Sequence, residues 1–124
     1  MSPRTITAAA RLALVAAVVT IAWLATTDRP PPVLENFSDK LQHAAAFLGL
    51  GLLADRSFPG TRFGVPKILA LLAFGVAIEV VQHYLPYRDA SLLDIVADVA
   101  GIALYAVART RLLTIPLLRP PANG

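Results

Sequence analysis

The 124-residue sequence contains no cysteine, and only 15% of its residues are charged. Without thiols the chain can form neither disulfide bonds nor cysteine-ligated metal sites. A soluble domain has about 25% charged residues, so the low charge content, together with 56% hydrophobic residues, indicates a membrane protein. The sequence also lacks the G-x-S-x-G, P-loop and H-E-x-x-H motifs, which leaves no familiar set of catalytic residues.

The net charge of +3 and the pI of 9.8 are values that also occur in nucleic-acid-binding proteins. Here, however, the Lys and Arg residues are scattered along the chain, whereas a phosphate-binding surface needs them clustered. Many of them flank apolar segments, which is typical of membrane proteins. We therefore expect the lipid bilayer, and no nucleic acid, as the main partner of the chain.

Four apolar segments run through the sequence, and each approaches the roughly 20 residues that a helix needs to cross a bilayer. The prolines at 30–32 and Pro86 lie between segments and cannot continue a helix. We predict an all-α fold, a polytopic four-transmembrane-helix bundle that forms one membrane domain over residues 1–124. An alternative for the first segment is a cleaved signal peptide, because basic residues precede its apolar core. The expected spans are residues 6–26, 39–57, 67–85 and 92–113.

Lys and Arg residues are distributed unequally between the two sides of such a bundle. Eight of the eleven lie on the side of the two termini, and three, Arg29, Lys40 and Arg88, lie on the other side. The side richer in Lys and Arg is normally cytoplasmic, so both termini are expected in the cytoplasm. The predicted location is the bacterial cytoplasmic (inner) membrane, which the chain would cross several times.

Polar residues gather where three of the predicted helices reach the outer leaflet. Lipid cannot solvate such groups, so we expect them to converge in one ligand-binding pocket. The cytoplasmic halves of the helices are expected to be dry, because Asp55 is the only one of eight acidic residues on that side. The expected pocket residues are Asp39, Lys40, His43, Glu79, Gln82, Arg88, Ser91, Asp94 and Asp98.

Helical spacing indicates which of these residues share a face. Asp39 lies four residues before His43, and Asp94 lies four residues before Asp98, so each pair is expected to lie on one face of its helix. Arg88 is the expected clamp for a carboxylate or a phosphate, because a guanidinium can bind either in a bidentate manner. The histidines and carboxylates show no spacing diagnostic of a metal, and we expect neither a metal nor a cofactor. Small residues expected to allow close helix packing include Gly49, Gly51, Ala97 and Gly101.

Three short motifs resemble those of the VanZ-like family of small bacterial membrane proteins, over about residues 39–105. The family commonly has Asn where this chain has Asp98, so this chain carries an additional carboxylate. The resemblance implies an association with resistance to the glycopeptide teicoplanin and assigns no biochemical activity. The motifs are Asp39-Lys40-Leu41-Gln42-His43, then Glu79-Val80-Val81-Gln82, then Arg88 followed by Ser91, Asp94, Asp98 and Gly101.

Three functional hypotheses are compatible with these residues. In the first, the outer-leaflet pocket recognises a cell-envelope component, such as a lipid-linked precursor, or an anionic lipid headgroup, through Lys40, His43 and Arg88. In the second, the chain is an intramembrane enzyme that acts on a lipid-linked phosphate or ester, with Glu79 or Asp98 as acid or base. In the third, the chain is a small proton-coupled transporter that uses the same two carboxylates as a relay. The dry cytoplasmic halves favour the first hypothesis over the third.

Overall fold

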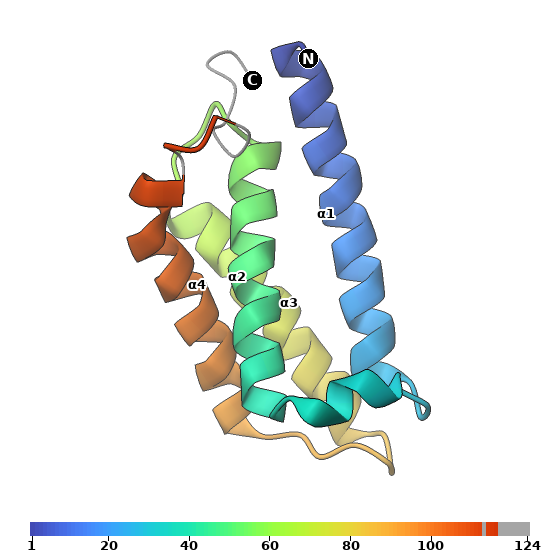
Figure 1. The fold of residues 1–124 in the computed structure, drawn as a ribbon. Helices are drawn as coiled ribbons and strands as arrows, with labels where there is room; N and C mark the ends of the chain where they lie inside the picture. The colour runs from blue at the N-terminus through green and yellow to red at the C-terminus, as the bar shows by residue number, and fades with distance from the viewer. Residues whose placement is uncertain (113, 117–124) are drawn as a thin grey trace.

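The computed structural model describes residues 1–112 and 114–116, and this part contains four α-helices, one short 3-10 helix and no strand. The expectation of an all-α chain with four long helices is confirmed for this part, and the predicted end of the last helix at residue 113 lies outside it. The start of α1 and the end of α4 lie at one end of the bundle, and η1 lies at the other (Figure 1). The elements are α1 (Pro3–Thr26), η1 (Pro32–Asn36), α2 (Asp39–Ser57), α3 (Val65–His83) and α4 (Leu92–Leu112).

Local sequence accounts for the boundaries of the helices. Ser38 caps α2, because its Oγ accepts a hydrogen bond from the backbone N–H of Leu41 at 3.1 Å. Ser2 caps α1 in the same way. α3 has a proline in its first turn, where a backbone N–H would have no partner within the helix, so its absence costs no hydrogen bond. The helix ends at His83, shortly before Pro86.

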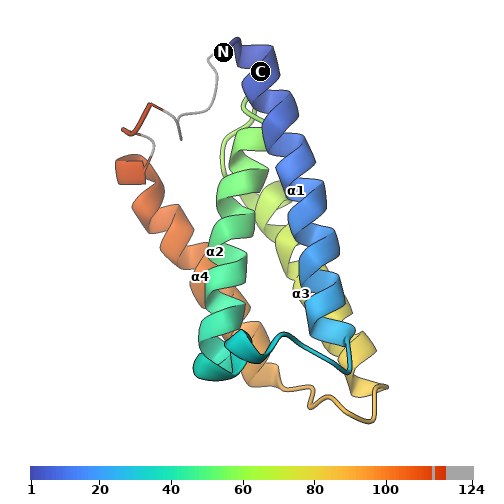
Figure 2. The ribbon, with the colours of Figure 1, turned by 45° about the vertical axis from the view of Figure 1, so that its right-hand side comes forward.

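α2 lies at the centre of the bundle, where it packs against α1, α3 and, most extensively, α4 (Figures 1 and 2). Five of the buried apolar residues form a small cluster, and three of the five come from α2. Leu14 and Val18 of α1 pack against this cluster from the side. The buried members are Phe47, Leu50, Ala54, Leu71 and Ile102.

The surface of the bundle is apolar and its interior contains charged residues. Leu12, Val15 and Val19 are exposed along α1, and further large apolar residues are exposed on α3 and α4. A water-soluble protein rarely exposes apolar surface on this scale and rarely buries charged side chains without partners. Buried charged or polar side chains include Asp55, Lys67, Glu79, Gln82, Asp94 and Asp98.

By length and apolar composition, two helices of the described part could cross a membrane, namely α1 and α3. The other two long helices contain more charged residues: α2 includes Asp39, Lys40, Asp55 and Arg56, and α4 includes two aspartates and two arginines. Two such apolar helices suggest that the protein associates with a membrane.

Candidate functional site

A close approach of the backbones of α2 and α4 brings the polar residues of these two helices together. A Cβ atom added at Gly101 would overlap the carbonyl oxygen of Ala44 and would lie 3.0 Å from the backbone N of Leu48. Only glycine therefore allows the two helices to lie this close. Asp94 and Asp98, which precede Gly101 on the same stripe of α4, consequently face the first turns of α2.

Lys40 and His43 of α2 meet the two aspartates of α4 directly. The Lys40 ammonium donates a hydrogen bond to Asp94 Oδ1 and lies 3.4 Å from Asp39 Oδ2. His43 Nδ1 lies 2.7 Å from Asp98 Oδ1, and His43 Nε2 lies 3.8 Å from Asp94 Oδ2. Asp94 and Asp98 are both almost completely buried. The structure therefore brings together Asp39, Lys40, His43, Asp94 and Asp98.

Glu79 approaches the same cluster from α3. Its Oε2 accepts a hydrogen bond from the backbone N–H of Ser91 at 2.9 Å, and its carboxyl group interacts electrostatically with Asp94 and His43. Glu79 is only 7% exposed, and its second oxygen, Oε1, has no hydrogen-bond partner among the described residues. The hydroxyl of Ser91 is used locally, because it accepts a hydrogen bond from the N–H of Leu93 at the start of α4.

Arg88 and Gln82 turn away from this cluster and bind the end of α1. Arg88 Nη2 donates to the carbonyl oxygens of Leu24 and Thr27, at 2.7 Å each. Gln82 Nε2 donates to the carbonyl of Ala25 at 2.9 Å. The carbonyls at a helix C-terminus lack helical partners, and these side chains supply them. Among the described residues Arg88 therefore clamps no carboxylate, and Lys40 pairs with Asp94 instead; the expected contact of Arg88 with a phosphate stays a prediction.

The charges of the cluster do not balance. Four carboxylates, those of Asp39, Glu79, Asp94 and Asp98, face one ammonium group and one imidazole. If all four are ionised, even a protonated imidazole leaves the cluster short of positive charge. Asp39, His43 and Asp94 each offer a ligand atom within 4.8 Å of the others, so these residues could hold a metal ion, which the sequence spacing did not indicate.

An apolar cavity of about 480 Å³ lies beside the cluster, between α1, α2 and α3 and against η1. Its walls are mainly aliphatic and aromatic, with Leu24, Phe37 and Ile78 among them. The Oε1 atom of Gln82 is buried there without a partner among the described residues. The polar residues of the lining are Asp39, Gln42, His43, Gln82 and Arg88. The cavity therefore combines a mainly apolar lining with a few polar groups.

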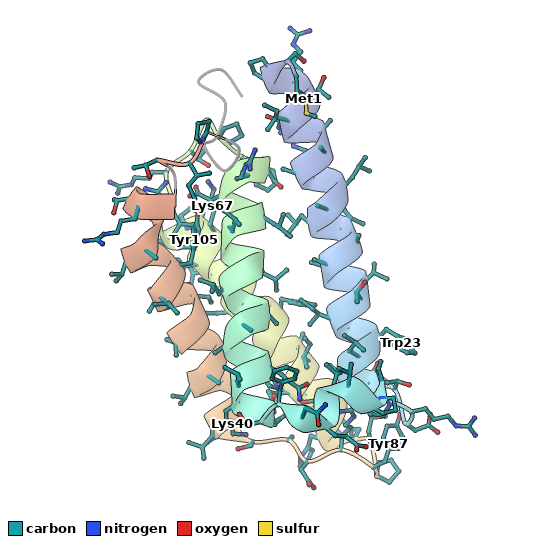
Figure 3. The ribbon with its side chains drawn as sticks, viewed as in Figure 1. Met1, Trp23, Lys40, Lys67, Tyr87 and Tyr105 are labelled. Atoms are coloured by element: carbon teal, nitrogen blue, oxygen red, sulfur yellow. The ribbon has the colours of Figure 1, made fainter. Side chains whose placement is uncertain are left out.

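A second polar cluster, which the sequence analysis missed, lies toward the other end of the bundle. Asp55 Oδ1 accepts from Lys67 Nζ at 3.1 Å, and Asp55 Oδ2 accepts from the hydroxyl of Tyr105 at 2.6 Å and from Arg109 Nη2 at 2.9 Å. Figure 3 shows Lys67 and Tyr105 near each other, far from Lys40. The expectation of dry cytoplasmic halves is therefore wrong. A usable signal was the spacing of Tyr105 and Arg109, which share one face of α4.

No protein-family model matches the sequence, no curated protein is significantly similar to it, and no solved structure resembles the fold at a significant level. The functional assignment consequently rests on the contacts and charges of the site.

Proposed function

We propose that this chain is a four-span protein of the VanZ-like type in the bacterial cytoplasmic membrane. Its outer-leaflet pocket would recognise an amphiphilic component of the cell envelope, in keeping with a contribution to glycopeptide resistance. The observation that carries the proposal is the apolar cavity of about 480 Å³ that adjoins a buried polar cluster at one end of the bundle.

The pairing of charges inside the bundle supports four spans rather than two. α2 and α4 are less apolar than α1 and α3 because they carry charged residues, and several of these residues are partners of one another. Lys40 binds Asp94, and Asp55 binds Arg109, across the interface of α2 and α4. Ionisable residues within membrane helices characteristically face the bundle interior and pair in this way. The exposed surface that remains is largely apolar and suits lipid.

The position of the aromatic residues supports the proposed depth of the pocket. Trp23 and Tyr87 lie at the same end of the bundle as Lys40 (Figure 3), and both are exposed. Trp and Tyr are enriched where membrane helices meet the headgroup region. The polar cluster would then lie just below the outer headgroups, within reach of a lipid that enters from the side.

The contacts of α1 support a retained first helix rather than a cleaved signal peptide. The carbonyl oxygens at its C-terminal end accept hydrogen bonds from Gln82, Tyr87 and Arg88. Arg11, near its other end, donates to the carbonyl of Ser57 at 2.9 Å. Removal of α1 would leave these polar groups without partners and would open one wall of the cavity.

The polar groups of the cavity favour one kind of headgroup. The charged or ionisable residues that line the cavity are Asp39, His43 and Arg88, and Arg88 uses its Nη2 to bind the carbonyls at the end of α1. The unpartnered Oε1 atom of Gln82 is a hydrogen-bond acceptor. We therefore propose a ligand with an acyl or prenyl chain and a headgroup that donates hydrogen bonds to Gln82, such as an amine or hydroxyl; the anionic headgroup expected from sequence, which would contact Arg88, is the alternative.

The enzyme hypothesis draws on a different observation. Glu79, with its unpartnered Oε1, lines a second cavity of about 450 Å³ between α3 and the start of α4. A buried carboxylate beside a cavity could act as a general acid or base. Transport is less well supported, because the apolar residues Phe47, Leu50 and Ile102 lie between the two polar clusters.

Filling the apolar cavity should remove the bound lipid. We expect Ala46→Phe, which places a ring in the cavity wall, to lower the amount of co-purifying lipid at least about tenfold, because the lost volume excludes the chain. Native mass spectrometry of the detergent-purified protein measures this directly. Ala106→Phe, on the exposed surface of α4, makes the same substitution outside the cavity and should leave the lipid in place. Equal lipid content in the two variants would contradict the pocket proposal.

Reporter fusions test the four-span topology independently. A fusion after Arg62 should report the cytoplasm, and a fusion after Tyr87 should report the outer side, because α3 lies between them. A fusion after Val33 serves as the control and should agree with the fusion after Tyr87. If the reporters after Arg62 and Tyr87 lie on the same side, the four-span arrangement is wrong.

A further inference from the structure

His43 is held in the orientation that a metal ligand requires. Its Nδ1 lies 2.7 Å from Asp98 Oδ1. When Asp98 is ionised it can only accept a hydrogen bond, so Nδ1 carries the proton, and in the neutral imidazole Nε2 then presents a lone pair. Histidines that bind metals almost always donate their other ring N–H to such a carboxylate or to a carbonyl, which fixes the ring and strengthens the ligand.

The second ring nitrogen of His43, Nε2, lies near two carboxylates. His43 Nε2 lies 3.9 Å from Asp39 Oδ1 and 3.8 Å from Asp94 Oδ2. In a tetrahedral site with metal–ligand bonds of about 2.0–2.1 Å, neighbouring ligand atoms lie about 3.3 Å apart. Small movements of the side chains would therefore bring the three atoms into a coordination sphere. Asp39 is at the exposed start of α2, so its side chain is free to make such a movement.

Glu79 supplies an independent observation at the same place. Glu79 is only 7% exposed, and its Oε1 has no hydrogen-bond partner among the described residues. Its carboxyl group interacts with Asp94 and His43, beside the three residues whose ligand atoms lie within 4.8 Å of one another. A buried carboxylate oxygen without a donor is costly unless a cation or a proton accompanies it. A divalent ion would meet this need and would also offset the excess of carboxylates in the cluster.

Lys40 occupies the region between Asp39 and Asp94 in the structure, and its side chain is 44% exposed. The long, flexible stem allows the ammonium group to swing outward to water or headgroups. Lys40 would then act as a competitor for the metal: it neutralises the carboxylates when the ion is absent and leaves when the ion binds.

We propose that Asp39, His43 and Asp94 form a binding site for a divalent transition-metal ion, with Asp98 as the positioning residue of His43 and Glu79 as a neighbouring buried carboxylate. An imidazole nitrogen combined with carboxylates suits Zn²⁺ or Mn²⁺, whereas Mg²⁺ prefers oxygen ligands alone. The site stands on its own contacts. If the protein binds metal but no lipid co-purifies, the metal-site proposal stands and the lipid-pocket proposal fails. If lipid co-purifies but no metal binds, only the metal-site proposal fails.

Isothermal titration calorimetry of the tag-free full chain in detergent, stripped with EDTA, tests the site. We expect one Zn²⁺ per chain and much weaker binding of Mg²⁺. His43→Ala should weaken Zn²⁺ binding at least about tenfold, and Asp98→Asn by roughly 10–100-fold, the usual effect of losing the carboxylate behind a metal-bound histidine. The matched control is His83→Ala, which removes the other histidine of the chain from an exposed position and should leave binding unchanged.

Two more variants keep the test decisive if substitutions in the buried residues disturb folding. Asp39→Asn changes a side chain that is 61% exposed, so the fold should survive while Zn²⁺ binding weakens. Lys40→Gln removes the competing ammonium and should tighten binding, which neither an adventitious surface site nor a purely structural cluster predicts. The proposal is overturned if the wild-type chain binds no Zn²⁺, if His43→Ala binds it as the wild type does, or if Lys40→Gln weakens binding.

Discussion

Replacing Asp55 with alanine is expected to destabilise the folded bundle by about 3–5 kcal/mol, the usual effect of removing one partner from a buried ion pair. The carboxylate is fully buried and receives hydrogen bonds from Lys67, Tyr105 and Arg109, which come from α3 and α4. Lys67 would keep only the carbonyls of Phe58 and Thr61 as partners. The melting temperature of the detergent-purified protein should fall by roughly 10–20 °C.

Two comparisons identify the cause of this loss. Asp89→Ala removes a carboxylate from an exposed loop and should change stability by less than about 0.5 kcal/mol. Replacing the whole network with apolar groups, through Asp55→Met, Lys67→Met, Arg109→Met and Tyr105→Phe together, should restore most of the stability, because no buried charge is left unpaired. If the melting temperature of Asp55→Ala lies within about 2 °C of that of the wild type, the network contributes little to the stability of the folded bundle.

Substitution of Gly101 with alanine should be the most damaging change of a small residue. The added Cβ would overlap the carbonyl oxygen of Ala44, which belongs to a helix backbone and cannot rotate away. α2 and α4 would have to separate, and this would also pull Asp94 and Asp98 from Lys40 and His43. We expect a loss of about 3 kcal/mol, the upper part of the range for overpacked interiors.

Gly49 provides the matched control on α2. A Cβ added there would meet no atom within 4 Å. Because glycine within a helix costs about 0.5–1 kcal/mol relative to alanine, Gly49→Ala should be neutral or stabilising. The two substitutions are chemically identical, yet only Gly101→Ala is expected to lower the melting temperature. A similar, small effect of both would show that the close contact of α2 and α4 does not contribute to stability.

The positions of the long helices could be predicted because they depend on local features. Apolar runs, the caps at Ser2 and Ser38 and the break before Pro86 are all visible in the sequence. The helix boundaries agree with the expected segments to within about three residues, which is the usual uncertainty of such boundaries. That α2 and α4 cross the membrane stays a prediction, because their charged residues make them less apolar than α1 and α3.

The composition of the polar site was partly predictable. Spacing correctly placed Asp39 with His43, and Asp94 with Asp98, on shared faces of α2 and α4. It did not predict that Arg88 would bind the end of α1, because the carbonyls it satisfies lie more than sixty residues earlier in the chain. Nor did it separate Glu79, which joins the cluster, from Gln82, which lies one turn further along α3 and contacts α1.

The sequence by itself determined that this chain is helical and rich in apolar residues, because these properties follow from composition and from periodicity along single segments. Only the tertiary structure decided which residues meet. Gly49, Gly51 and Gly101 are equivalent in sequence terms, yet Gly51 faces the ring of Tyr105, Gly101 faces the backbone of Ala44, and Gly49 faces no atom within 4 Å. The rotation and separation of packed helices set these contacts, and they depend on all four helices at once. The same geometry places His43 between Asp98 and two further carboxylates, an arrangement that no spacing within a single helix could specify.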